Sequence, residues 1–591
     1  MDNKDDGEYR FWENEDMDAS IIRMEITAAA AYAAMASAAL AAPGRTKFIA
    51  NAWEFGPAWP KDFVAAADEF DKTAIDGVGI FLKGYTPDGK LIGMRDIFSA
   101  DWTYEAFAPL IPDMREMTKH KAFRESFCAS FRSPLKNTGR IAWEDDETWA
   151  RVARNMRVAA RIAREGGFRG LQMDVEDYNH VRQFVRQPDE KPFRELSPLV
   201  RRRAAEVFGG AFEEYPDMVL LSFWMLSSTP SWYDVNDLAG FVRDKGDLWP
   251  SFVNGILDVL PPTAKIVDGD ENGYRYEAQK NMFYNRAVRT RRGLTPLVAP
   301  ENREKYDKQM LVSFGQYFDM YTHPTNSSWA FPPLDGSRLE RFRVNLTQAV
   351  ELADEYIWLW GERFHLVNWA DGYTENPSLY KGTWEERLPG VTAMMKFVKD
   401  PQAFARERMA ELSAQGRLVN LVSNGVDEAG ADTGVPKFGT WRAGDDKGVG
   451  SFGIDPKGGE NGGPALCATG CLSGCYVITL KGVKHGEYYA IRISSLGEGA
   501  SAGVSWRNAE NKYVGRAVKM SFEGDDMDKW RQCLLPVYIP AGAASMTLTL
   551  DASIGDGVKV WFDNVGIYKL HDAPGPEPDP DDFEPVAKDD K

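Results

Sequence analysis

The chain has 591 residues, of which 43% are hydrophobic and 27% charged, the composition of a globular protein long enough for two or three domains. Its formal net charge of −18 argues against a nucleic-acid or anionic-membrane partner. Five cysteines are too few for a disulfide scaffold, and the spacing of Cys467, Cys471 and Cys475 does not match a zinc site. We therefore expect no metal and no cofactor.

Residues 1–45 read as an acidic arm followed by a signal-like segment. Residues 26–42 are apolar and Ala-rich and end in an A-x-A pattern, as export signals do. The run is too short and too rich in Ala for a membrane span, so no membrane insertion is expected. Because signal peptides begin with basic residues, we expect a mis-assigned start codon, with translation from Met17 or Met24, and a secreted or periplasmic protein. The alternative is a disordered arm followed by an ordinary helix.

Between residues 46 and 400, strand-like segments alternate with amphipathic helical segments. Strands are expected at 46–55, 75–84, 127–131, 170–177, 217–226, 264–274, 308–321 and 355–362. Eight such alternations over roughly 350 residues predict an α/β fold, a (β/α)8 TIM barrel. A doubly wound open sheet is the alternative. The sequence contains no G-x-G-x-x-G after a strand and no G-x-x-x-x-G-K-[ST], which disfavours the nucleotide-binding versions of that fold.

The pattern changes near residue 415. A helical linker is expected at 401–416, and a β pattern then continues through 417–570. Short strands separated by turn residues are expected there at 475–483, 487–496, 502–508, 532–540, 545–553 and 558–570. This pattern predicts an all-β sandwich of jelly-roll type. The final segment, 571–591, is rich in Pro and Asp and is expected to form a disordered acidic tail.

The sandwich sequence resembles the carbohydrate-binding modules that are appended to secreted polysaccharide-degrading enzymes. The resemblance lies in the opening LVNLVSNGVDE, the middle GEYYAIRISS and the close VWFDNVGIYKL. The resemblance covers about a quarter of the chain. Sandwiches of this type also occur as spacer domains. The resemblance implies a polysaccharide or oligosaccharide as the partner of this protein.

In a (β/α)8 barrel the working residues lie at the C-terminal ends of the strands. Applied to the expected strands, this rule selects carboxylates and aromatic or amide side chains: Trp53, Glu54, Asp174, Glu176, Tyr178, Trp224, Asp268, Asp270, Glu271, Asn272, Tyr274, Trp360 and Glu362. Glycoside hydrolysis needs this combination, because two carboxyl groups flank the scissile bond and aromatic faces stack on sugar rings. We expect Asp174, Glu176, Glu271 and Glu362 to be catalytic and the others to bind substrate.

Asp174 and Glu176 end the fourth expected strand. Residues two apart on an extended strand share a face, so Asp174 would raise the pKa of Glu176, as suits a general acid. The pair looks like the D-x-E of chitinase-like barrels, in which the Glu is the acid, but the longer D-x-x-D-x-D-x-E signature is not met. The seventh expected strand carries Asp319 but no Glu, unlike the common retaining barrel clan. The nucleophile or base is therefore expected to be Glu271 or Glu362.

The segments IVDGDENGY and YIWLWGE together resemble a group of barrel proteins from polysaccharide-degrading bacteria. This resemblance supports a bacterial (β/α)8-barrel glycoside hydrolase with a C-terminal carbohydrate-binding-module-like sandwich. Two alternatives stay open: a non-catalytic glycan-binding protein on the same scaffold, and a polysaccharide lyase that uses Tyr274 and Arg275. The sequence shows no H-E-x-x-H, and residues 46–400 contain no G-x-S-x-G, which disfavours a metallohydrolase and a serine hydrolase that uses an elbow in the α/β pattern.

Overall fold

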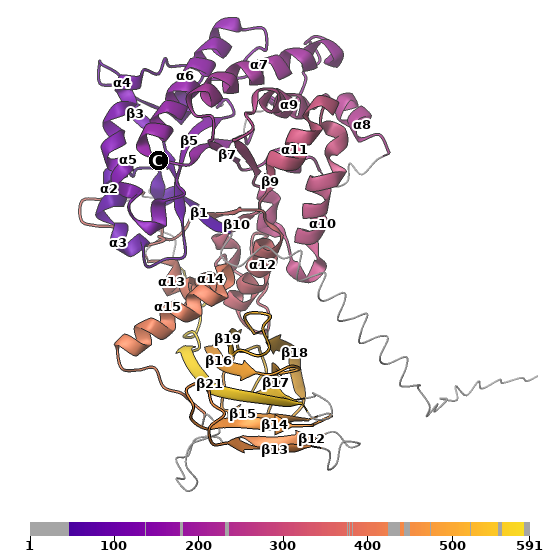
Figure 1. Cartoon of the computed structure of the whole chain (residues 1–591). Helices are drawn as coiled ribbons and strands as arrows, with labels where there is room; N and C mark the ends of the chain where they lie inside the picture. Colours follow the sequence, from indigo (N-terminus) through magenta and orange to yellow (C-terminus); the bar gives the residue numbers. More distant parts are fainter. Residues whose placement is uncertain are drawn as a thin grey trace, which may run out of the picture. The chain divides into compact units, whose positions relative to one another are not determined.

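The computed structural model of the protein describes residues 46–583 except for several short gaps (Figure 1). The gaps are 136–137, 178–180, 231–235, 375, 377–378, 381, 423–437, 443–449, 473, 521 and 553–557. The expected export signal and Tyr178 therefore lie outside the described residues, and both stay predictions.

A curled parallel sheet of nine strands forms the centre of what we call the α/β region, residues 46–414. Its strands are β1 (Lys47–Ala52), β2 (Gly77–Phe81), β5 (Phe127–Arg132), β6 (Gly170–Asp174), β7 (Val219–Ser222), β8 (Lys265–Asp268), β9 (Met310–Val312), β10 (Gly315–Tyr317) and β11 (Tyr356–Gly361). They lie in the order β10-β11-β1-β2-β5-β6-β7-β8-β9. Only two residues separate β9 from β10 in the chain, so one segment supplies both ends of the sheet. This arrangement is consistent with a TIM-like barrel.

Each of the eight segments expected to form a strand in this region contains one, and the seventh contains both β9 and β10. The sequence did not indicate the small antiparallel hairpin of β3 (Lys83–Tyr85) and β4 (Leu91–Gly93). All pairings within the nine-stranded sheet are parallel, so the carboxyl ends of the strands meet at one edge.

Helices lie around the parallel strands in Figure 1. They are α2 (Pro60–Ala65), α3 (Ala67–Phe70), α4 (Tyr104–Phe107), α5 (Ile111–Met117), α6 (Asp146–Gly166), α7 (Phe193–Glu214), α8 (Leu238–Asp244), α9 (Trp249–Val259), α10 (Met282–Val288), α11 (Arg303–Gln309), α12 (Arg338–Leu352), α13 (Trp384–Arg387), α14 (Val391–Lys399) and α15 (Pro401–Ala414). Capping residues at both ends explain where α6 begins and where it stops. Asp145 accepts a hydrogen bond from the Thr148 backbone N–H at 3.0 Å, and Gly167 adopts a left-handed conformation with φ 78°.

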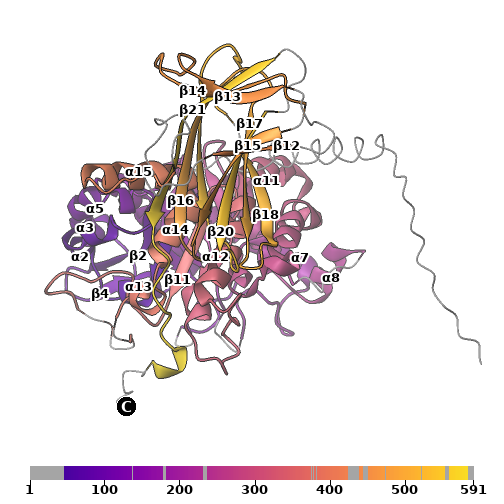
Figure 2. The same ribbon diagram turned by 90° about the horizontal axis from the view of Figure 1, so that it is seen from below.

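Two antiparallel five-stranded sheets form the β region, residues 438–571 (Figure 2). One sheet has the order β12 (Gly439–Arg442), β15 (Gly474–Lys481), β20 (Ser545–Asp551), β17 (Ser501–Arg507) and β18 (Tyr513–Met520). The other has the order β13 (Ser451–Asp455), β14 (Ala465–Thr469), β21 (Lys559–His571), β16 (Tyr488–Leu496) and β19 (Arg531–Tyr538). Buried residues alternate along β20, and the two sheets enclose an apolar core of their own, as in a β-sandwich.

The sequence indicated six of these ten strands and missed β12, β13, β14 and β18, which are short, exposed or rich in Gly. The helix α15 occupies most of the expected linker and packs with α14 against the β region. Phe404 and Ala405 of α15 form a small buried cluster with Tyr488, Ala490 and Leu570. The α/β and β regions belong to one compact unit.

The structure corrects the expectation of a disordered tail for residues 571–583, whereas residues 584–591 lie outside the described part of the chain. Residues 572–583 lie against the α/β region and include the 3-10 helix η14 (Pro580–Asp582). The Glu577 carboxylate accepts hydrogen bonds from residues 337–339, and the Phe583 ring lies 5.3 Å from the ring of Phe364. Composition predicted disorder because few apolar residues are present. The tertiary partners that hold this segment lie about 240 residues earlier in the chain, as the separation of 240 for Ser337 and Glu577 shows.

Candidate functional site

Three glutamates follow three different strands and influence one another electrostatically. Glu176 follows β6, Glu271 follows β8 and Glu362 follows β11. The pKa of Glu271 is raised to about 9, mainly by burial, and charges on Glu176, Asp174 and Glu362 add to the increase. The pKa of Glu176 is raised to about 7, mainly by burial and then by Asp174 and Glu362. The edge where the strands end therefore holds carboxyl groups that compete for protons.

The fourth expected strand ends earlier than the sequence suggested. β6 ends at Asp174, and the Asp174 side chain accepts a hydrogen bond from the backbone N–H of Glu176 at 3.1 Å. This is an Asx-type hydrogen bond between residues two apart, and the expectation that the two side chains share a face stays a prediction. The Asp174 charge raises the pKa of Glu176, as expected.

Arg132, at the end of β5, is the cation beside this pair, and the sequence analysis missed it. Parallel pairing of β5 with β6 places Arg132 opposite Asp174. Burial raises the pKa of Asp174, and the Arg132 charge acts in the opposite direction. Arg132 also lowers the pKa of Glu176. Arg132 directly follows the third expected strand, so the strand-end rule could have selected it, but only the register between β5 and β6 shows that it lies opposite Asp174.

Glu271 begins the 3-10 helix η7 (Glu271–Arg275), which two residues separate from the end of β8. Its backbone N–H donates to the Phe223 carbonyl oxygen at 3.1 Å, which fixes the start of the turn. Its Oε2 atom is buried and has no hydrogen-bond partner among the described residues. A buried carboxylate oxygen without a donor is costly when ionised, which agrees with the raised pKa of this group. The arrangement keeps a protonated carboxyl group beside Glu176 at neutral pH.

Glu362 has a different environment, because both of its oxygens accept hydrogen bonds. Tyr317 donates its hydroxyl to Oε2 at 3.0 Å, and the Trp360 indole N–H donates to Oε1 at 2.8 Å. The backbone N–H of Glu362 donates to Asp319 Oδ2 at 2.8 Å. Asp319 is fully buried, and its pKa is raised well above its ordinary range by burial. Glu362 is thus held in one orientation by Trp360 of β11, by Tyr317 of β10 and by Asp319 in the turn after β10.

Aromatic side chains surround the carboxyl groups. The ring of Tyr274 lies 5.0 Å from that of Tyr317 and 5.3 Å from that of Trp358. Tyr317 lies 6.0 Å from the exposed Trp329, over which the Arg275 guanidinium stacks at 3.8 Å. The rings therefore continue from the carboxyl groups to the surface. Tyr274 was predicted, whereas Tyr317 and Trp329 were not, because neither carries a distinctive motif.

Glu54 was expected to contact substrate, and its position corrects that expectation. Its side chain has no exposed surface. Its oxygens accept hydrogen bonds from the Leu366 backbone N–H at 2.8 Å and the Trp369 indole N–H at 2.7 Å, and they lie 2.9 Å from His365 Nδ1. Glu54 therefore holds the loop after β11 and is a structural residue. Its neighbour Trp53 remains exposed at 41%.

Asp268 and Asp270 were also expected at the substrate, and both are almost fully buried. Asp268 accepts hydrogen bonds from the backbone N–H groups of Met225 and Ser227 at 2.7 and 2.9 Å, which fixes the turn after β7. Asp270, with φ 33°, accepts a hydrogen bond from the Tyr276 hydroxyl at 2.9 Å. These contacts make both aspartates structural supports of the loops that carry the site.

The other predicted residues lie near the strand ends with different exposure. Asn272 is exposed, and Trp224 and Trp360 are partly buried. Trp360 lies 6.1 Å from the Phe223 ring, which stacks on Trp358 at 4.1 Å. Within the part of the chain that the structure describes, no three His, Cys, Asp or Glu residues are placed to hold a metal ion. No helix within the described ranges is long and apolar enough to cross a membrane.

No protein-family model matches the chain, and no curated protein matches it. Among solved structures, the CBM22-1 xylan-binding domain from Paenibacillus barcinonensis Xyn10C is 15% identical, with 26% of this chain and 97% of that chain covered and a TM-score of 0.20. A family 16 carbohydrate-binding module is 17% identical, with 25% and 99% covered and a TM-score of 0.19.

An enzymatically active domain of bacteriophage CBA120 tailspike protein 4 is 12% identical, with 26% of this chain covered and a TM-score of 0.21. The chain spans only 22% of the tailspike domain and 24% of a Clostridium thermocellum xylanase 10B structure that contains CBM22-1 and GH10 modules. The latter is 15% identical, with 20% of this chain covered and a TM-score of 0.17. These scores are too low to assign a function, which has to come from the residues themselves.

Proposed function

We propose that the protein hydrolyses glycosidic bonds in a polysaccharide or oligosaccharide, and that the parallel sheet is a (β/α)8 barrel whose C-terminal strand ends carry out the reaction. The observation that carries this proposal is the convergence of Glu176, Glu271 and Glu362 from three strands, with the pKa raised in two of them. Glycoside hydrolysis requires one protonated and one ionised carboxyl group on either side of the bond, and aromatic surfaces to hold the sugar.

Glu176 is proposed as the general acid. A pKa of about 7 keeps part of the group protonated near neutral pH and still allows proton transfer to the leaving oxygen. Asp174 contributes to this value by its charge. Glu271, with a pKa of about 9, stays protonated beside Glu176 and limits the negative charge of the cluster.

Glu362 is proposed as the nucleophile or base. Hydrogen bonds from Tyr317 and Trp360 fix both of its oxygens, so the carboxylate keeps one orientation relative to the sugar. Attack by Glu362 on the anomeric carbon would retain configuration at a carboxyl separation of about 5 Å, and activation of water would invert it at about 6.5–9.5 Å.

The test is hydrolysis of a broad panel of polysaccharides and aryl glycosides by the wild type and three variants, Glu176→Gln, Glu271→Gln and Glu362→Gln. Glu487→Gln, which changes a buried carboxylate of the β region, is the matched control. We expect losses of about 100-fold or more for Glu176→Gln and Glu362→Gln, and none for the control. Normal cleavage of a panel substrate by both site variants would refute the assignment.

The second candidate function is glycan binding without catalysis, and it is favoured by a face of the β region. Trp441 and Tyr513, on the two edge strands of one sheet, are 56% and 69% exposed. The Arg507 guanidinium stacks over Tyr513 at 4.0 Å. Exposed aromatic rings of this kind suit stacking on sugars. Retention of the protein on an insoluble polysaccharide, without release of reducing ends from any panel substrate, would favour this function.

A further inference from the structure

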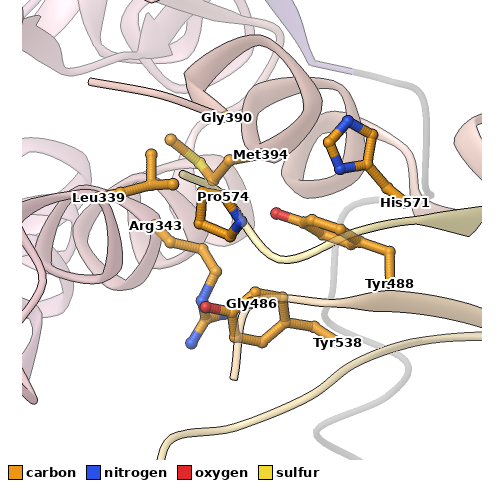
Figure 3. A pocket seen from close by; sticks show the side chains of 9 residues that line it. All are labelled: Leu339, Arg343, Gly390, Met394, Gly486, Tyr488, Tyr538, His571 and Pro574. Carbon is orange, nitrogen blue, oxygen red and sulfur yellow. The ribbon is translucent and has the colours of Figure 1, made fainter. Parts of the chain in front are cut away.

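The segment that follows the last strand of the β region runs back along the α/β region. β21 ends at His571, and Pro574 then lies among Leu339, Arg343, Met394 and Tyr488 (Figure 3). Two glycines provide the space for its ring. A Cβ at Gly390 would lie 3.1 Å from Pro574 Cβ, and one at Gly486 would lie 2.6 Å from Pro574 Cδ. The path of the chain is therefore built into the packing of both regions. We call residues 572–583 the strap.

Glu577 of the strap caps helix α12. Its Oε1 accepts hydrogen bonds from Ser337 Oγ at 2.7 Å and from the Leu339 backbone N–H at 3.0 Å. Its Oε2 accepts from the backbone N–H of Arg338 at 2.9 Å and from its Nε at 3.1 Å. Burial acts to raise the pKa of Glu577, but these hydrogen bonds and the Arg338 charge lower it below its ordinary value. The carboxylate satisfies donors that the helix end leaves open.

Beyond Glu577 the strap reaches two loops of the α/β region. Asp581 accepts hydrogen bonds from the backbone N–H and the hydroxyl of Thr325, both at 3.1 Å. The Phe583 ring lies 5.3 Å from that of Phe364, and the Arg387 guanidinium lies 5.0 Å from the centre of the Phe583 ring. Each contact is with a segment that follows one of two adjacent strands, β10 and β11.

These two loops are the ones that hold Glu362. Thr325 lies shortly after the 3-10 helix η12 (Phe318–Tyr321), which contains Asp319, the acceptor for the Glu362 backbone N–H. Phe364 lies two residues after Glu362, and the intervening Arg363 donates to the Thr322 carbonyl oxygen. The strap therefore contacts both loops that fix the position of the proposed nucleophile or base.

We propose that the strap is a positioning element of the candidate active site, with Asp581 and Phe583 holding the two loops that orient Glu362. The effect of the strap on turnover rests on the proposed function, whereas its effect on the amide hydrogen exchange of the two loops does not. The β region thereby contributes to catalysis through its C-terminal extension, in addition to any glycan binding.

The test compares two shortened forms of the full chain. One ends at Gly575 and lacks Glu577, Asp581 and Phe583, and the matched control ends at Phe583. Amide hydrogen exchange is measured for segments 318–325 and 362–366, together with kcat and KM on an active panel substrate. We expect the form ending at Gly575 to exchange about tenfold faster in both segments and to lose about tenfold in kcat with KM little changed, and the control to match the wild type.

A synthetic peptide of residues 576–591 added to the form ending at Gly575 should restore protection and turnover. The same peptide with Glu577→Gln and Phe583→Ala should not. If the shortened form does not fold, the full-length double variant Asp581→Asn with Phe583→Ala gives the same two measurements and keeps the Glu577 cap. Unchanged exchange in both segments would overturn the proposal, even if turnover fell. If the wild type cleaves no glycan, the proposed function fails and the exchange measurement alone decides on the strap.

Discussion

Glu487 in the β region and Glu271 in the α/β region both bury carboxyl oxygens, but their surroundings differ. Glu487 accepts hydrogen bonds from the Lys484 backbone N–H at 2.9 Å and the Tyr489 hydroxyl at 2.7 Å, and Lys569 Nζ lies 2.6 Å away. Glu271 has a buried oxygen with no partner among the described residues, and four other acidic groups act on it electrostatically. The first arrangement holds a structure together, whereas the second destabilises its own charged form.

The comparison suggests where each region carries function. Carboxyl groups with raised pKa values cluster at functional sites more often than elsewhere, and Glu176 and Glu271 lie at the strand ends of the α/β region, where we propose the reaction takes place. The core of the β region is apolar, and Trp441 and Tyr513 are exposed on the edge strands β12 and β18 of one of its sheets. The following predictions test this division, beginning with the largest expected effect.

The largest expected effect distinguishes the proposed roles of Glu176 as general acid and Glu362 as nucleophile or base. We expect Glu176→Gln to lose about 1,000-fold on natural glycans but only about tenfold on dinitrophenyl glycosides, because a good leaving group needs no proton. Glu362→Ala should lose activity on both, and added azide should restore part of it if Glu362 is the nucleophile. Measured kcat values with the two leaving groups check the roles, and equal losses for both substrates in Glu176→Gln would contradict its role as acid.

Stability should respond with opposite signs to changes at the two buried carboxyl groups. Glu487→Ala should lower the free energy of unfolding by about 2 kcal/mol, because it leaves buried donors without an acceptor. Glu271→Gln should instead raise Tm at pH 8 by roughly 3 °C. The pKa of Glu271 is higher in the folded protein, at about 9, than in the unfolded chain. Its contribution to stability is therefore fully present below the unfolded pKa of about 4.3 and is lost as pH rises toward 9.

Calorimetry at pH 5 and pH 8 checks this pair of variants. At pH 5 the Glu271→Gln variant and the wild type should unfold at nearly the same temperature, because pH 5 lies so close to the unfolded pKa of about 4.3 that protonating the carboxyl group on folding costs only about 1 kcal/mol. A lower Tm for Glu271→Gln at both pH values would show that Glu271 is a paired structural residue like Glu487.

The value of kcat/KM should fall at alkaline pH, and the charge on Asp174 should set the pH at which the fall begins. Because the proposed acid has a pKa of about 7, kcat/KM should drop by about tenfold per pH unit above that value. Asp174→Asn removes a charge that raises this pKa, so the alkaline limb should move to lower pH. The pH profile of each enzyme on one substrate is the measurement. An alkaline limb that does not move would show that Glu176 is not the titrating acid.

The smallest expected effect concerns the outer face of the β region. Trp441→Ala and Tyr513→Ala should each weaken retention on an insoluble polysaccharide by about three- to tenfold, the loss of one aromatic stacking contact. Hydrolysis of soluble substrate should stay within about twofold, because binding by an appended region raises local concentration only. Tyr284→Ala, an aromatic residue of the α/β region that is 55% exposed, is the matched control. Equal retention of all three variants on the polysaccharide would show that Trp441 and Tyr513 do not bind glycan.

Sequence periodicity located the strands of the parallel sheet because most are buried apolar runs bounded by turns or helices, whereas it did not indicate the short hairpin of β3 and β4. It selected Glu176, Glu271 and Glu362 because strand ends share an edge in a parallel sheet. The same rule also selected Glu54 and Asp268, which proved structural. A carboxylate at a strand end looks the same in the sequence whether or not distant backbone N–H groups surround it, as those of Leu366 and Met225 do here.

The sequence by itself determined the order of strands and helices, the change near residue 415 from an α/β pattern to a β pattern, and the set of acidic residues that could meet at the strand ends. These features follow from local periodicity, which needs only neighbouring residues. The tertiary structure alone decided which carboxyl groups are paired, that Arg132 lies opposite Asp174, and that residues 572–583 are held in place. Those outcomes depend on contacts between segments far apart in the chain, and the burial and charge that set their energies exist only after folding.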